Sequence, residues 1–284
     1  MPSDLHIHMI LDGADFRAAI NTHRAVPCDD LIRSRLADYH TRGITLLRDG
    51  GDAWGVSLRA KALAPEYGID YRSPAFPIYK KGHYGSFIGK GFSDWAEYAA
   101  LLREVRASGG DFVKLMISGL IDFSHANTLT EDGLSAQEIH TMVRMAKDMG
   151  FAVMVHANGD AAVAAAIDAG VDSIEHGAYI DAPTLARLAE SGILWVPTLA
   201  TIGNLIGCGR HPDEVLQTLL REQQKKAAFV AAHGGLVGSG SDAGAFRVYH
   251  GQAVQNEYSY LSAAIGKKTD EILIRAEDFV RNRF

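Results

Sequence analysis

Two histidines one residue apart lie close to the amino end of the chain, in the run DLHIH at residues 4–8. Side chains alternate between the two faces of a strand, so His6 and His8 point to the same side if residues 5–11 form a strand. Two imidazoles placed in this way can bind one metal ion, but a pair of histidines on a solvated strand face has the same spacing. The pair alone is therefore a weak indication of metal chemistry.

Further side chains that can bind a metal ion follow short apolar runs along the rest of the chain. They are Lys114, His156, His176 and Asp242. In a barrel of parallel strands, the carboxyl ends of all strands meet at one rim, so residues remote in sequence come together there. The sequence thus predicts that four imidazoles, one carboxylate and one lysine converge on a single site.

Lys114 is the unusual member of this set, because it lies between Val113 and Leu115 in an apolar run. Burying a protonated amine costs free energy, so burial lowers the lysine pKa and favours the neutral amine. A neutral amine can add carbon dioxide and become a carbamate, whose two oxygens can bridge two metal ions. The alternative is an ion pair between Lys114 and an acid such as Glu175 or Asp242.

Short runs rich in Val, Ile, Leu and Phe alternate with longer stretches of helical periodicity. This alternation is typical of parallel βα units, and eight such pairs favour an α/β fold of the closed (β/α)8 barrel type. Strands are predicted at residues 5–11, 44–49, 69–76, 112–118, 152–157, 173–176, 194–199 and 236–241. Helices are predicted at residues 29–42, 54–65, 93–108, 135–149, 160–169, 181–191, 212–233 and 252–264. The longest irregular stretches, residues 77–92 and 119–134, should lie over the rim where barrel active sites form.

Two of the predicted helices have a recognisable start. Ser93 and Ser135 can each accept a hydrogen bond from the first turn of the helix that follows. Glu138 stands three residues after Ser135, which is the spacing of a capping box.

The composition is that of an ordinary globular protein of 284 residues, with 47% hydrophobic and 22% charged residues, so one domain over residues 1–284 is expected. A net charge of −6 argues against a nucleic-acid partner. No apolar run approaches the roughly 18 residues that cross a bilayer. Cys28 and Cys208 lack the spacing of a zinc ribbon or a disulfide framework. We therefore expect a cytoplasmic protein that acts on a small molecule, without a membrane partner.

The six candidate ligands together resemble the metal site of the amidohydrolase superfamily, with HxH on strand 1, a carboxylated lysine on strand 4, histidines on strands 5 and 6 and an aspartate on strand 8. The runs DFVKLM, HANGDAA and VDSIEHG, which contain Lys114, His156 and His176, are most similar to those of imidazolonepropionase-like and prolidase-like metal-dependent hydrolases. The strand 5 motif there usually reads HxHG, and Asn158 stands here in place of the second histidine. The resemblance implies a TIM barrel of the metal-dependent hydrolase type.

The resemblance also implies a binuclear metal centre and its chemistry. The implied ligands are His6, His8 and Asp242 for one divalent ion, His156 and His176 for the second, and the Lys114 carbamate as the bridge. Zinc suits imidazole and carboxylate ligands, although manganese and iron bind them too. A hydroxide shared by the two ions would be the nucleophile, and Asp242 would carry its proton to the leaving group. The implied reaction is hydrolysis of an amide or peptide-type C–N bond, in a dipeptide or an N-acyl amino acid, and the same residues could open a lactone.

Two other functions stay open at this point. A deaminase or cyclic-imidate hydrolase would use one metal ion and leave Lys114 unmodified, and the number of ions bound per chain separates it from the binuclear hydrolase. A non-catalytic barrel that serves as a scaffold is the third possibility. Six ligands on five strands favour an enzyme over a scaffold.

Polar residues on the loops that follow the strands are candidates for substrate contact. His83, Tyr179 and Arg247 are favoured, and the other candidates are Tyr79, Tyr84, His125 and Thr198.

Many relatives carry a small β-sandwich formed by residues before strand 1 and after the last barrel helix, and we expect this chain to lack it. It would then be either a barrel-only member or a shortened relative whose barrel floor is poorly covered. Self-association into a homo-oligomer that hides apolar surface is expected in that case.

Overall fold

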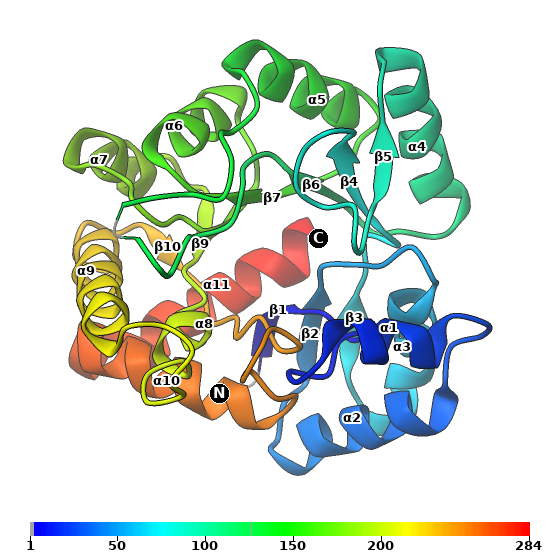
Figure 1. Ribbon diagram of the computed structural model, residues 1–284, viewed down its shortest axis with the longest axis horizontal. Helices are drawn as coiled ribbons and strands as arrows, with labels where there is room; N and C mark the ends of the chain where they lie inside the picture. The colour runs from blue at the N-terminus through cyan, green and yellow to red at the C-terminus, as the bar shows by residue number, and fades with distance from the viewer. Residues whose placement is uncertain (1–2, 126) are drawn as a thin grey trace.

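The computed structural model describes residues 3–125 and 127–284. It has an α/β fold in which helices surround a group of parallel strands (Figure 1). The strands form two sheets, a three-stranded one in the order β1-β2-β3 and a seven-stranded one in the order β10-β9-β8-β7-β6-β4-β5. The predicted α/β class with parallel strands is therefore confirmed.

The strands are β1 (Ser3–Ile7), β2 (Leu46–Asp49), β3 (Asp70–Arg72), β4 (Pro77–Lys80), β5 (Lys90–Phe92), β6 (Val113–Met116), β7 (Val153–Ala157), β8 (Ser173–His176), β9 (Leu194–Val196) and β10 (Leu236–Val237). The helices are α1 (Phe16–His23), α2 (Asp29–Thr41), α3 (Val56–Leu63), α4 (Trp95–Ala107), α5 (Ala136–Asp148), α6 (Asp160–Ala169), α7 (Ala182–Glu190), α8 (Ala200–Gly203), α9 (Asp213–Ala232), α10 (Gln252–Ile265) and α11 (Thr269–Arg283), with short 3-10 turns at η1 (Ala64–Tyr67) and η2 (Gly266–Lys268). None of the helices in this described part of the chain combines the length and apolarity needed to cross a membrane.

The third predicted strand, residues 69–76, is shorter in the structure. Only residues 70–72 form a strand, β3, which pairs with β2, and β4, which pairs with β6, begins at Pro77 beyond the predicted range. Between them Pro74 offers no N–H, and Ala75 has a φ of +65°, so the extended ladder is interrupted there. The stretch 77–92 was predicted to be irregular, and this is wrong in part, because β4 and β5 pair in parallel.

The segment after β10 runs beside β1 through single backbone hydrogen bonds. β10 itself pairs with β9. Further along, Leu5 N–H donates to the carbonyl of Ser239 at 2.8 Å, and Asp242 N–H donates to the carbonyl of His6 at 2.7 Å. These bonds place Asp242 next to β1, which contains His6 and ends one residue before His8.

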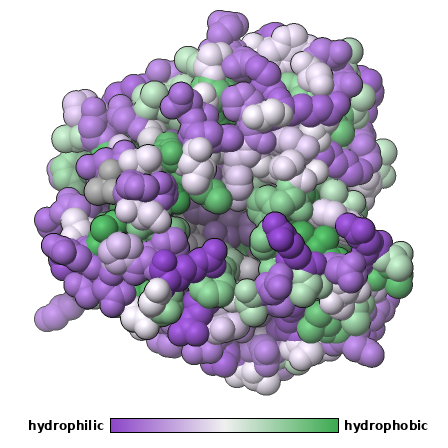
Figure 2. Space-filling view, viewed as in Figure 1, coloured by the Kyte–Doolittle hydropathy of each residue, from purple (hydrophilic) through white to green (hydrophobic). Residues whose placement is uncertain are grey.

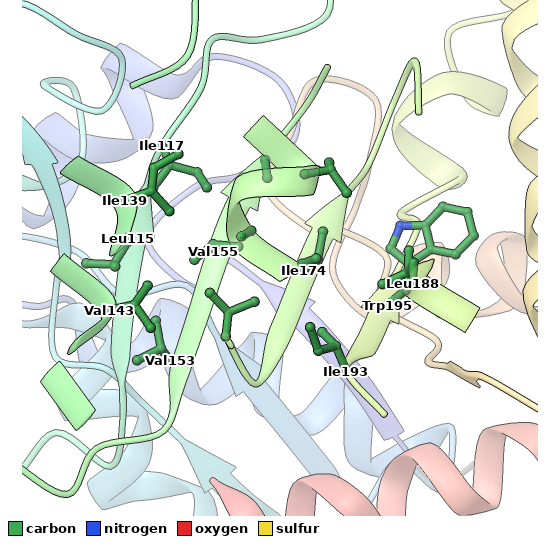
Figure 3. Packing of buried hydrophobic residues seen from close by; sticks show 14 of the residues in the cluster. Leu115, Ile117, Ile139, Val143, Val153, Val155, Ile174, Leu188, Ile193 and Trp195 are labelled. Atoms are coloured by element: carbon green, nitrogen blue, oxygen red, sulfur yellow. The ribbon is translucent and has the colours of Figure 1, made fainter. Parts of the chain in front are cut away.

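The outer faces of β6 to β9 pack against the helices that follow them (Figure 3). The buried residues in this layer include Leu115, Val153, Val155, Ile174 and Trp195 from the strands, and Ile139, Val143 and Leu188 from α5 and α7. Because side chains alternate along a strand, Lys114 points to the side opposite Val113 and Leu115. The apolar packing of one face therefore directs the polar side chains of the same strands inward.

The predicted capping box at the start of α5 is confirmed, with Ser135 and Glu138 bonding to each other's backbone N–H. The predicted cap at Ser93 is wrong. Asp94 caps α4 instead, because its carboxylate accepts the Glu97 N–H at 2.8 Å. Both helices begin on the side where the preceding strands end.

The helix α11, which the sequence analysis did not predict, covers the amino ends of the strands. In Figure 1 it crosses the middle of the ring of helices, and the carboxyl terminus lies near the centre. Val280 and Phe284 pack in one buried cluster with Leu5 and Phe112, and the rings of Phe112 and Phe284 have centroids 5.2 Å apart. The expectation of a poorly covered floor is therefore wrong for the residues that the structure describes.

Replacing Phe284 by alanine should lower the free energy of unfolding by about 3 kcal/mol, because it empties a buried aromatic site. The ring is 6% exposed and also lies under the Arg48 guanidinium, 4.7 Å from its centroid. Urea unfolding followed by circular dichroism measures the change. The control is Ile274→Ala on the same helix, which is 52% exposed and should cost less than about 1 kcal/mol. Equal losses in the two variants would contradict the role assigned to Phe284.

Candidate active site

The six predicted ligands all line one cavity of about 600 Å³. They are His6, His8, Lys114, His156, His176 and Asp242. The space-filling view shows a face that is hollowed near its centre, with hydrophilic residues deep in the hollow and hydrophobic patches on its walls (Figure 2). Residues separated by up to 236 positions in the chain thus meet where the strands end.

The closest group consists of His6, His8 and Asp242, which offer one ligand atom each within 4.8 Å of one another. Asp242 Oδ1 lies 3.6 Å from His6 Nε2 and 3.5 Å from His8 Nε2. His6 Nε2 is buried and has no hydrogen-bond partner among residues 3–125 and 127–284. Two imidazole nitrogens and a carboxylate oxygen form a donor set that suits zinc. The orphaned nitrogen fits a metal ligand, since a buried polar atom otherwise needs a hydrogen-bond partner.

His156 and His176 form the second group, and their ring centres are 4.5 Å apart. The His176 ring centre lies 5.1 Å from that of His6, so the two groups are adjacent. His156 Nε2 is 3.1 Å from the carbonyl oxygen of Gly119, which can only accept, so the hydrogen lies on Nε2 and the lone pair on Nδ1. His176 Nδ1 bonds Thr198 Oγ1 at 2.7 Å, which leaves His176 Nε2 for a ligand.

Asn158, which replaces the second histidine of the strand 5 motif, hydrogen-bonds the loops next to His156 and His176. Its side-chain oxygen accepts the Ala178 N–H at 3.0 Å, and its Nδ2 lies 3.3 Å from both Gly119 O and His156 Nε2. The residue therefore positions the loop that follows β8 and the Gly119 carbonyl, which in turn accepts from the His156 ring.

Lys114 is fully buried, and its Nζ has no hydrogen-bond partner in the described part of the chain. Burial lowers the pKa of Lys114 to about 8, so a neutral amine is accessible near physiological pH. The alternative ion pair with Glu175 or Asp242 is not formed among the described residues. An orphaned amine next to five metal-binding side chains fits the carbamate that the sequence pattern implies.

Glu175 is a functional residue that the sequence analysis treated only as a possible partner of Lys114. Its Oε2 accepts a hydrogen bond from His6 Nδ1 at 2.6 Å, and its Oε1 accepts one from Arg48 at 2.8 Å. The carboxylate thereby fixes the proton of His6 on Nδ1 and leaves the Nε2 lone pair directed at Asp242. The sequence could have indicated this role, because Glu175 is an acidic residue within the buried strand SIEH.

Three strand ends in the site have left-handed backbone conformations at residues other than glycine. The φ angles are +69° at His176, +50° at Thr198 and +59° at Asp242. Such conformations are strained for residues with a Cβ and cluster at functional sites. They turn the chain where each strand ends, and His176 and Asp242 line the cavity as a result.

Two glycines allow the histidines of β1 to sit where they do. A Cβ on Gly50 would lie 2.3 Å from His8 Cε1, and a Cβ on Gly240 would lie 2.8 Å from the backbone nitrogen of His6. A side chain at Gly50 would displace the His8 ring, and one at Gly240 would press on the backbone of His6. These glycines were a signal that the sequence analysis did not use.

Burial sets the protonation of the imidazoles in this cavity. It lowers the pKa of His8 and of His156 to about 3, with the nearby Lys114 charge as the second cause, and it lowers the pKa of His6 and His176 well below the usual value. All four rings are therefore neutral at pH 7 and keep a lone pair for a metal ion. Burial also raises the pKa of Asp242 to about 7, which bound cations would oppose.

The three residues favoured for substrate contact do not line the cavity in the part of the chain that the structure describes. His83 Nδ1 lies 3.7 Å from Glu131 Oε1, Tyr179 is half-buried, and Arg247 is exposed. Their role in substrate binding stays a prediction. Tyr84, a less favoured candidate, does line the cavity, with its ring centre 4.9 Å from that of His156.

Comparison with curated proteins gives partial matches, and no family model matches the chain. The chain is 33% identical to ochratoxinase from Aspergillus niger over 94 residues. This matched region covers 33% of this chain and 19% of the relative. Over 167 residues the chain is 29% identical to an uncharacterized protein from Mycobacterium tuberculosis, which covers 56% of this chain and 44% of the relative. The matched region thus spans less than half the length of these curated relatives.

Solved structures resemble the chain over almost its whole length. The A. niger ochratoxinase structure has a TM-score of 0.77 at 20% identity and covers 96% of this chain and 68% of its own. A Xaa-Pro dipeptidase with bound methionine has a TM-score of 0.75 at 21% identity and covers 97% and 75%. A structure of a bottromycin amidohydrolase has a TM-score of 0.67 at 16% identity and covers 98% and 66%. The resemblance to prolidase-like amidohydrolases is therefore confirmed at the level of the fold.

Replacing Glu175 by glutamine should weaken zinc binding by about 10- to 100-fold, because His6 loses its charged hydrogen-bond acceptor. Competition with a chromogenic chelator measures the affinity. The same variant leaves the Arg48 guanidinium buried without its carboxylate, so the free energy of unfolding should also fall by about 3 kcal/mol. Glu190→Gln, at an exposed position, is the control and should change neither quantity. Unchanged zinc affinity in the Glu175 variant would show that the carboxylate does not position His6.

Proposed function

We propose that this chain is a metal-dependent hydrolase that cleaves amide or peptide-type C–N bonds, built on a single (β/α)8 barrel domain over residues 1–284. The observation that carries the proposal is the convergence of six donor side chains in one buried cavity. The fold shared with prolidase-like amidohydrolases, ochratoxinase and a bottromycin amidohydrolase supports the same reaction class.

Contacts at both junctions between the two sheets support the barrel. On one side, β1 bonds the segment 239–243 that continues β10. On the other, β3 pairs with β2, and β4, which follows it after only residues 73–76, pairs with β6. The helix α11 closes the end opposite the cavity. This arrangement supports one domain whose donor side chains face the open end.

The donor groups fit two divalent metal ions, with zinc favoured by imidazole and carboxylate ligands. The proposed ligands are His6, His8 and Asp242 for one ion, His156 and His176 for the other, and Lys114, as the carbamate formed with carbon dioxide, for both. Bound ions of this kind lower the pKa of water toward neutrality and polarise a carbonyl group.

Asp242 is the proposed catalytic acid and base. Its carboxylate lines the cavity within reach of His6 and His8, where it can exchange a proton with a bound water or a leaving group. It would accept the proton of the attacking water and then donate it to the amine nitrogen, which cannot leave as an anion. Glu175 and Thr198 hold the neighbouring rings still during this transfer.

The proposed substrates are dipeptides or N-acyl amino acids, and a lactone could be opened by the same groups. The test is a panel of these three classes, assayed with the purified protein before and after chelation and after addition of zinc or manganese. Amide hydrolysis that is lost with the metal and restored by it supports the proposal. Turnover that survives complete metal removal, or a protein that binds no divalent ion, would overturn it. A cytoplasmic location and a homo-oligomer stay predictions.

Replacing Lys114 by alanine should reduce bound metal from about two ions per chain to about one or fewer, because the bridging ligand is lost. Turnover should fall below detection for the same reason. Metal analysis of the dialysed protein gives the stoichiometry. Wild-type activity in this variant would favour the one-metal deaminase or cyclic-imidate hydrolase, in which Lys114 is unmodified.

Replacing Asp242 by asparagine should keep much of the metal but lower kcat by about 10²- to 10⁴-fold, since the amide retains an oxygen donor but does not carry the proton. Metal analysis and initial rates on the same sample separate the two effects. A loss of rate that merely parallels a loss of metal would contradict the proton-transfer role of Asp242.

A further inference from the structure

One cation on the cavity wall is not used by the proposed reaction. Arg210 lies in the loop between α8 and α9 and lines the cavity. Its side chain has no carboxylate partner among residues 3–125 and 127–284, and its guanidinium carbon lies 4.6 Å from the centroid of the Phe246 ring. A guanidinium on an aromatic face keeps its in-plane N–H donors free for a second partner.

The next residue adds a second donor at the same place. His211 also lines the cavity, and its Nδ1 is buried without a hydrogen-bond partner in the described part of the chain. Its ring centre lies 5.4 Å from that of Phe123, which belongs to the opposite loop. A buried ring nitrogen without a partner costs free energy unless a ligand supplies one. Arg210 thus offers free N–H donors to the cavity, and the His211 ring beside it has a nitrogen without a partner, which donates in the tautomer that carries its hydrogen on Nδ1.

The loops that carry these groups are tied to each other. Asn204 Nδ2 donates to the carbonyl of Arg247 at 3.1 Å, and Asn204 Oδ1 accepts from Asn256 at 2.8 Å. The Gly207 N–H donates to Asp213 Oδ1 at 2.8 Å, which anchors the turn before Arg210 to the first residue of α9. The loop with Arg210 and the loop with Phe246 therefore form one fixed wall of the cavity.

Much of the remaining mouth is apolar, although Asp122, Thr130 and Thr201 also line it. The Asp122 carboxylate is hydrogen-bonded to His125 Nδ1 at 2.7 Å and to the Ser124 N–H at 2.8 Å. Three of the large hydrophobic residues that remain exposed on the molecule line this cavity, namely Phe16 at 45%, Leu120 at 41% and Phe246 at 39%. Exposed apolar side chains that gather around one cavity mark a binding surface rather than ordinary surface scatter. A molecule that covers them would bury apolar area next to the guanidinium.

We infer that Arg210 and His211 form an anion subsite at the mouth, which selects amide substrates with a carboxylate beside a large apolar group. The inference rests on the proposed hydrolase function and adds the residues that determine its specificity. The carboxylate would accept hydrogen bonds from the guanidinium and the imidazole, and the apolar group would cover the residues around them. Neither residue touches the reacting bond in this arrangement.

The test compares two amides that differ only in the carboxylate, N-benzoyl-leucine and N-(3-methylbutyl)benzamide. Removal of the charge in Arg210→Met should raise KM for the acid by at least about tenfold, as expected for a lost charge-assisted hydrogen bond. Its kcat for the acid, and both constants for the neutral amide, should change less than about threefold if the group only binds. Arg210→Lys should fall between the two. Arg221→Met, an exposed arginine on α9, is the matched control and should behave as wild type.

Calorimetric binding of the same acid to the wild type and to Arg210→Met separates the two proposals. If no amide is hydrolysed but the acid binds and Arg210→Met weakens it, the hydrolase function is wrong and the anion subsite stands. If both amides are hydrolysed equally well by wild type and variant, the subsite is wrong and the hydrolase stands. Failure of the acid to bind the wild type at all would also overturn the subsite.

Discussion

The buried pair formed by Glu175 and Arg48 is the interaction on which the rest of the site depends. Two charges inside a protein are tolerated only when each finds several partners. Arg48 meets this condition by donating to Glu175, to Ser173 and to the carbonyl of Leu5, and Glu175 meets it by accepting from His6 as well. The pair therefore joins β1, β2 and β8 from the inside and fixes the separation of the strands that bear the histidines.

The sequence predicted the candidate ligands because they follow two simple rules. Lys114 alternates with Val113 and Leu115, so the packing of one face determines the direction of the other. His6, His156, His176 and Asp242 all lie at the ends of parallel strands, which meet at one rim. The sequence did not predict α11, because its apolar residues lie among many charged ones over residues 269–283. The shortening of the third predicted strand depends on Ala75, whose left-handed backbone has no signature in its residue type.

The favoured substrate contacts could not be predicted reliably from their position in loops. Tyr179 and Arg247 follow strand ends, as predicted, but both have positive φ angles. Position after a strand fixes the face of the molecule on which a residue lies and leaves open the direction of its side chain. Arg210 lies in a connection that carried no motif, and its place on the cavity wall follows from tertiary bonds such as that between Asn204 and Arg247. Such bonds have no counterpart in local sequence.

The stacking of Phe284 on Arg48 affects how small molecules can enter and leave the cavity. With this ring and α11 packed against the amino ends of the strands, the residues that the structure describes fill the interior on that side. If the chain is the proposed hydrolase, both fragments of a cleaved molecule would leave by the route through which the intact molecule entered. The fragment nearer the outside would then depart before the deeper one, so the architecture would impose an order on release.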